Sequence, residues 1–82
     1  MTMQMHLLDY LARRTNCLFL SDLRHLDGRG QRLLLQVLEG LPAETAPLKE
    51  WNDALRYLAG ASPEETAGKA RARLLALLDS PR

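Results

Sequence analysis

The chain is almost free of β-branched residues, and this feature narrows its possible folds more than any other. Its 82 residues include 19 Leu and ten Ala, but only one Val, four Thr and no Ile. Sheets favour stiff β-branched and aromatic side chains, whereas Leu, Ala, Arg, Glu and Gln lose little rotamer freedom in a helix. With 46% hydrophobic residues the chain also has enough apolar side chains for a core. The composition therefore predicts an all-α fold, arranged as one compact helical domain over residues 1–82.

Gly and Pro residues divide the chain into segments of helical length, and the spacing of apolar residues predicts five short helices. Short loops join these segments, which is typical of a compact bundle with neighbouring helices antiparallel. The predicted helices cover residues 4–14, 22–26, the stretch between Gly30 and Gly40, residues 47–59, and the stretch from Pro63 to the Ser80-Pro81 stop.

The apolar run at residues 17–20 is the ambiguous part of this pattern, because periodicity cannot assign so short a run. One interpretation is an extended entry at 17–20, followed by a short helix that Ser21 caps. The alternative is a single helix over 18–26, because Phe19 and its apolar neighbours downstream also keep helical spacing.

Several residues are typical of helix ends. Asn16 suits a left-handed cap after the first helix, and Gly60 suits the end of the fourth. Ser62 is predicted to cap the fifth helix, with Pro63 at its first position and a capping box completed by Glu65. Residues 27–30, Asp-Gly-Arg-Gly, are predicted to form a turn before the third helix.

The third and fourth helices differ in how much of their surface is apolar. On the fourth helix, Trp51, Leu55 and Leu58 share one face, which predicts a core element, and Tyr57 falls on the opposite face. The third helix has an apolar arc of about 200°, so it is either central to the core or partly covered by a partner. The polar strip that remains on it consists of Arg29, Arg32, Gln36 and Glu39.

The net charge is +1, too small to indicate nucleic acid or a membrane by itself. The charge is unevenly distributed, with +2 over residues 1–36, −4 over 37–66 and +3 over 67–82. The single Cys17 excludes an internal disulfide and fits a reducing compartment. No apolar stretch approaches the ~20 residues that span a bilayer, and the first residues lack the pattern of a secretory signal. We therefore expect a cytoplasmic protein that does not bind membranes.

The residues that could carry catalysis do not form a recognisable motif. Cys17 lies 11 residues after His6 and 8 before His25, spacings that fit neither a nucleophile motif nor adjacent metal ligands on a helix. The Gly-rich turn lacks the spacing of a phosphate-binding loop. Four carboxylates, those of Glu50, Asp53, Glu64 and Glu65, are explained by helix capping and solvation. Because none of these patterns indicates a catalytic or metal site, we expect no enzyme activity, no metal and no cofactor.

Two binding functions remain. The first, which we prefer, is a regulatory or accessory module that binds another protein or a second copy of itself. Methionine-rich surfaces adapt to partners, and the third helix has more apolar surface than a small core needs. The candidate partner surface is Met3, Met5, Leu33 and Leu35.

The alternative is a helix-turn-helix-like DNA-binding protein that uses the third helix. Arg29, Arg32 and Gln36 share one face, and Arg and Gln are side chains that read guanine and adenine. Three further arginines could contact phosphates. The acidic middle of the chain, expected to pack close to this helix, argues against DNA binding. The three phosphate-contact candidates are Arg13, Arg14 and Arg24.

Overall fold

The computed structural model describes residues 5–17 and 19–79, and within these ranges the chain forms helices and no strand. The all-α prediction is confirmed, although four of the elements are α-helices and two are short 3₁₀ helices, rather than five helices. The elements are α1 (Leu7–Arg14), η1 (Leu20–His25), α2 (Gly28–Glu39), η2 (Ala43–Thr45), α3 (Leu48–Ala59) and α4 (Ala67–Leu78).

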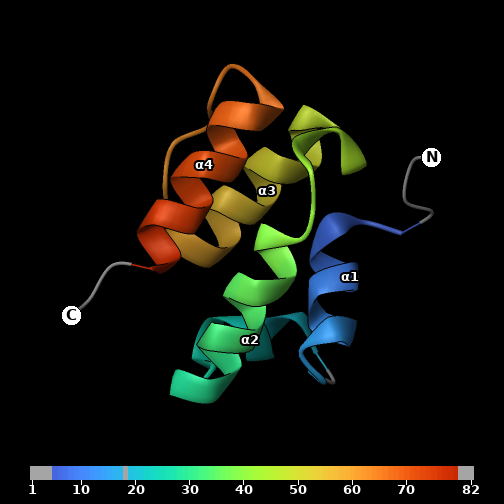
Figure 1. Ribbon diagram of the computed structural model, residues 1–82, viewed down its shortest axis with the longest axis vertical. Coiled ribbons are helices and arrows are strands. Elements are labelled where there is room, and N and C mark those ends of the chain that lie inside the picture. Colours follow the sequence, from blue (N-terminus) through green and yellow to red (C-terminus); the bar gives the residue numbers. More distant parts are fainter. Residues whose placement is uncertain (1–4, 18, 80–82) are drawn as a thin grey trace.

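Helix α3 packs against α4, α1 and η1 (Figure 1). The most extensive contact is between α3 and α4, which lie side by side. Helix α1 packs against α3, α2 and η1, while α2 packs against α1 and α4. Helix α2 therefore bridges α1 and α4, while α1 also contacts α3 directly.

The core is built mainly from leucines around one tryptophan. Trp51 is completely buried on α3, and its indole N–H donates a hydrogen bond to the carbonyl of Ala43 at 2.7 Å. This bond satisfies the one polar atom of a large apolar side chain. Ala54 and Leu55 are also fully buried, and Leu58 is half-buried, so the prediction that this segment is a core element is confirmed.

Two of the predicted helix ends are confirmed in detail. Asn16 has φ of 59°, the left-handed conformation that an asparagine tolerates after a helix. Gly60 has φ of 64° and ends α3, where its N–H donates to the carbonyl of Arg56. Helix α3 begins at Leu48 directly after Pro47, one residue later than predicted.

The turn predicted at residues 27–30 is wrong, because these residues begin α2. The Asp27 side chain accepts a hydrogen bond from the Gly30 N–H at 2.8 Å, and the helix starts at Gly28. This side-chain cap outweighs the low helix propensity of two glycines. Gly30 packs closely against Leu26, because a Cβ at this position would lie 2.8 Å from a methyl carbon of Leu26 and would force that side chain to shift.

Neither interpretation of the apolar run holds in full, and the prediction that Ser21 caps the short helix is wrong, because Ser21 lies inside η1. Phe19 is extended, with φ of −128° and ψ of 153°, and the 3₁₀ helix η1 starts at Leu20 and ends at His25. The Asp22 carboxylate accepts a hydrogen bond from the Phe19 N–H at 3.2 Å, which stabilises this entry. Residue 18 lies outside the described residues.

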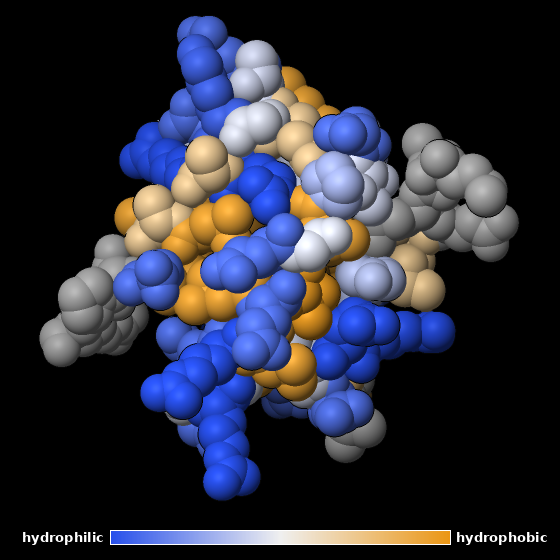
Figure 2. Space-filling view, in the orientation of Figure 1, coloured by the Kyte–Doolittle hydropathy of each residue, from blue (hydrophilic) through white to orange (hydrophobic). Residues whose placement is uncertain are grey.

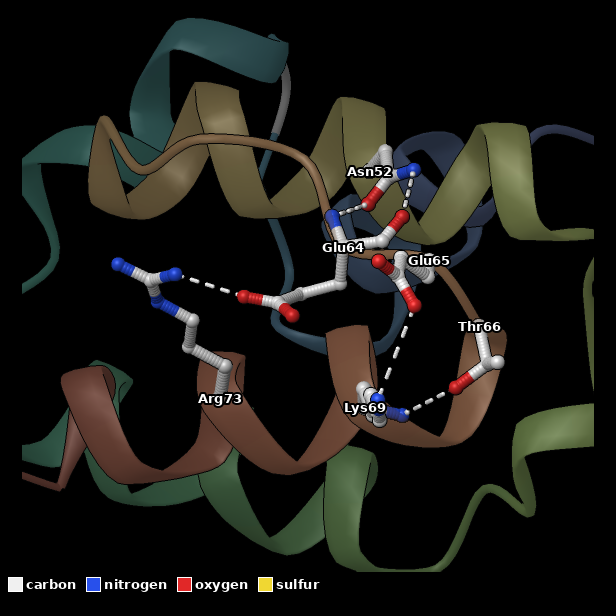
Figure 3. Close-up of polar contacts among 6 residues, drawn as sticks. All are labelled: Asn52, Glu64, Glu65, Thr66, Lys69 and Arg73. Carbon is white, nitrogen blue, oxygen red and sulfur yellow. Dashed lines mark hydrogen bonds and ion pairs between the residues drawn. The ribbon is translucent and has the colours of Figure 1, made fainter.

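The prediction that Ser62 caps the last helix is wrong. Helix α4 begins at Ala67, and the cap is Thr66, whose hydroxyl accepts a hydrogen bond from the Lys69 N–H at 3.1 Å. The reason lies in another helix (Figure 3). The Asn52 side chain on α3 accepts a hydrogen bond from the Glu64 N–H at 2.9 Å and donates one to the Glu64 carbonyl at 3.2 Å. These two bonds hold the backbone at residue 64 outside a helix.

Helix α1 also starts later than predicted, at Leu7 instead of residue 4. His6 is extended, and its Nδ1 accepts a hydrogen bond from the Leu8 N–H at 3.1 Å. The Leu7 N–H donates to the Glu50 carboxylate of α3 at 2.8 Å. The first turn of α1 is therefore capped partly by a side chain from another helix.

Candidate functional site

The polar strip predicted on the third helix lies open on α2. Arg29, Arg32, Gln36 and Glu39 are all exposed, whereas Leu34 faces the core with 2% exposure. The strip therefore has the accessibility that a base-reading helix needs.

The other predicted phosphate contacts lie at the same end of the molecule. Arg13 and Arg14 are exposed on the last turn of α1, and Arg24 is exposed on η1. Figure 1 shows that the end of α1, η1 and the start of α2 lie together at the lower end, which Figure 2 shows as strongly hydrophilic. We call this region the basic end and define it as Arg13, Arg14, Arg24, Arg29 and Arg32.

The guanidinium groups of the basic end have no carboxylate within ion-pair distance among the described residues. Two of them instead lie over tyrosine rings, Arg14 at 6.0 Å from the centroid of Tyr10 and Arg24 at 5.4 Å from that of Tyr57. The carboxylates of Asp22 and Asp27 are at this end too, where they cap backbone N–H groups.

The acidic middle of the chain, expected to pack close to this helix, is divided between elements: Glu39 lies on α2 itself, whereas α3 contains two acidic and two basic residues and is net neutral. Helix α3 packs against α4, α1 and η1, whereas the neighbours of α2 are α1 and α4. Because α3 is net neutral and does not contact α2, it exerts little electrostatic repulsion on an anionic partner at α2.

A second feature, which the sequence did not single out, is a groove between η1, α2 and the ends of α3 and α4. Its volume is about 540 Å³, and Leu77 on its edge is 41% exposed. Arg24 is the one charged side chain among the described residues that line it. We call it the leucine groove; its lining is Leu23, Arg24, Leu26, Gln31, Leu34, Leu58, Ala59, Leu77 and Leu78. Part of the sequence signal for it is the helical spacing of the leucines near the end of the last predicted helix, where Leu77 and Leu78 lie.

The predicted partner surface is not brought together as one patch. Leu33 is 36% exposed and Leu35 is half-buried. Two residues along a helix are about 200° apart around its axis, so these leucines lie on opposite flanks of α2. Met5 is half-exposed before α1, and Met3 lies outside the described residues.

Both ring nitrogens of His6 are engaged. Nδ1 accepts from the Leu8 N–H, and Nε2 lies 3.1 Å from a carboxylate oxygen of Asp53 on α3. The neutral tautomer with its proton on Nε2 satisfies both contacts. In this arrangement His6 has no nitrogen free to act as a general base, although it contacts a carboxylate as a catalytic histidine does.

The remaining chemical candidates have local partners. The Cys17 thiol is half-buried, with its Sγ 3.2 Å from the Thr15 hydroxyl. Glu64 pairs with Arg73 at 2.6 Å, and Glu65 lies 3.9 Å from Lys69 (Figure 3). Within the described ranges, no three His, Cys, Asp or Glu side chains gather closely enough to hold a metal ion.

Comparisons with protein-family models, with curated proteins and with solved structures gave no match to this chain. Along the described residues, each helix is too short or too polar to cross a membrane.

Proposed function

We propose that this protein is a small binding module without catalytic activity that recognises another protein through the leucine groove. The observation that carries the proposal is the groove itself, a concavity lined mainly by leucines, of which Leu77 is the most exposed, although polar atoms make up more of its open surface than apolar atoms do. Open apolar surface costs free energy in water, and grooves of this kind between helices commonly receive an apolar helix face.

The partner that fits best is an amphipathic helix with leucine-like side chains on one face and acidic residues beside it. The leucine-rich walls accept the apolar face. The single charged lining residue, Arg24, and the neighbouring basic end favour carboxylates at the edge of the contact. Carboxylates on the partner would also increase its association rate through electrostatic attraction.

The test is a titration of the protein with a labelled helical peptide of about 18 residues that has Leu at helical spacing and Glu on its other face. Leu77→Glu introduces a charge at the groove edge without creating a cavity in the core, because Leu77 is 41% exposed. We expect this change to weaken peptide binding at least about tenfold, as a lost apolar anchor does.

Leu33→Glu is the matched control, because Leu33 is similarly exposed but does not line the leucine groove. We expect it to leave peptide affinity unchanged. Equal weakening by both substitutions would contradict the groove as the binding site. A dimer in sedimentation velocity that Leu77→Glu dissociates would identify a second copy as the occupant and overturn the acidic-helix partner.

A second candidate function, nucleic-acid binding by α2, is favoured by one observation. The five arginines of the basic end lack carboxylate partners among the described residues, and the strip on α2 is open to solvent. Guanidinium groups without a carboxylate partner are available to bind phosphates and the edges of guanine bases.

Retention on duplex DNA over a salt gradient separates the two candidates. If α2 reads DNA, binding falls steeply with salt and Arg32→Ala weakens binding to a specific site by roughly 1–3 kcal/mol. If the leucine groove is the functional site, retention is low and unchanged by Arg32→Ala, and we expect this second outcome.

A further inference from the structure

A second groove lies where the start of α1, η1 and the middle of α3 meet, and its chemistry differs from that of the leucine groove. Its volume is about 420 Å³, within the range of small-ligand sites. We call it the arginine groove, and its lining is His6, Leu8, Arg24, Asp53, Arg56 and Tyr57.

The arginine groove presents two guanidinium groups from different elements. Arg24 comes from η1 and Arg56 from α3, and neither has a carboxylate within ion-pair distance among the described residues. Arg24 lies over the ring of Tyr57, 5.4 Å from its centroid. This contact already restricts the side chain, so a ligand that binds Arg24 loses less free energy to side-chain ordering.

The one carboxylate in the groove is already paired. Asp53 lies 3.1 Å from Nε2 of His6, and the other ring nitrogen of His6 is held by the Leu8 N–H. This pairing moderates the repulsion that Asp53 would exert on an anion. The lining keeps a net positive charge, because two arginines face a single carboxylate.

The groove also has an apolar part. Leu8 and the ring of Tyr57 line it, and no described group forms a hydrogen bond with the Tyr57 hydroxyl, which is therefore available as a donor. A ligand for such a site combines an anionic group with a ring-sized apolar body.

We propose that the arginine groove binds a phosphate monoester carried on an aromatic or apolar ring. Two guanidinium forks match the several oxygens and the double negative charge of a monoester better than they match one carboxylate. The ring would lie against Leu8 and Tyr57. This site shares Arg24 with the leucine groove but none of its other lining residues, and the proposal does not require the protein-binding function.

The test is an NMR titration of the ¹⁵N-labelled full chain with phenyl phosphate, with inorganic phosphate and benzoate as comparison ligands. We expect phenyl phosphate to shift the amides around residues 6–8, 24 and 53–57. Its affinity should exceed that of either comparison ligand by about tenfold, because only phenyl phosphate has both the dianion and the ring. Equal affinity for benzoate would overturn the phosphate assignment, and an absence of shifts at these amides would overturn the site.

Arg56→Gln is the decisive variant, because Arg56 is exposed, lines only this groove and forms no ion pair with a described carboxylate. We expect it to weaken phenyl phosphate binding by about tenfold while the circular dichroism spectrum stays unchanged. Arg13→Gln removes another exposed arginine, one that does not line the groove, and should leave affinity unchanged. Equal loss in both variants would mean that general positive charge attracts the ligand, and the proposal would be wrong.

Discussion

Leu55 and Tyr57 lie two residues apart on α3 and face different surroundings. Leu55 has no exposed surface, whereas Tyr57 is half-buried under the guanidinium of Arg24. Leu55→Ala should destabilise the fold by roughly 2–5 kcal/mol through lost burial and a cavity. Tyr57→Ala should cost clearly less, because solvent can fill the space it leaves. Urea unfolding of both variants checks this, and equal midpoints would contradict the packing of α3.

Thr66 and Ser62 are the observed and the predicted caps of the last helix. Thr66→Ala removes the acceptor of the Lys69 N–H and should cost about 0.5–2 kcal/mol. Ser62→Ala should change stability by a few tenths of a kcal/mol at most, because Ser62 is exposed and precedes α4 by five residues. A larger loss for Ser62→Ala in thermal unfolding would mean that α4 starts earlier in solution.

At the scale of elements, Arg71 links α4 to the end of α2. Its Nε donates to the Leu41 carbonyl at 2.6 Å, and one terminal nitrogen donates to the Glu39 carbonyl at 3.1 Å. The Glu39 carbonyl ends α2 and the Leu41 carbonyl follows it, so neither accepts a hydrogen bond from a later N–H of the same helix. Arg71→Met keeps much of the apolar stem but removes the donors, so we expect a loss of about 1–3 kcal/mol.

Arg73→Met is the control for this link. Arg73 pairs with Glu64 at 2.6 Å, but its side chain is 47% exposed. Exposed ion pairs contribute about 0–1 kcal/mol, so the loss should be smaller than for Arg71→Met. Chemical denaturation of the two variants gives the comparison, and the reverse order would show that the α2–α4 link adds little to stability.

At the scale of the whole molecule, the described helices share one hydrophobic core with Trp51 buried at its centre. The chain has no other tryptophan, so fluorescence reports on this core alone, whereas circular dichroism reports on all helices. We expect both signals to give the same urea midpoint and slope, because the helices lose their shared core together. A separate earlier transition in circular dichroism would show that α1 or α2 unfolds before the α3–α4 pair.

The sequence by itself determined the features that depend on composition and neighbouring residues. Scarce β-branched residues predicted the all-α class, apolar spacing predicted the buried face of α3, and Asn16 and Gly60 predicted two helix ends. These features follow from backbone and side-chain preferences that act over one or two helical turns. The exposure of Arg29, Arg32 and Gln36 was predictable for the same reason.

Only the tertiary structure decided the features that depend on residues far apart in the chain. Asn52 binds the backbone of Glu64 and moves the start of α4 to Ala67, although the local capping signal favours Pro63. His6 contacts Asp53 across 47 residues, and both grooves form between elements that are not adjacent in sequence. A local sequence pattern indicates which conformation a segment prefers by itself. A hydrogen bond from another helix can outweigh a local capping preference of about 1 kcal/mol. The residues that form such a bond are far apart in the chain, so no local pattern contains it.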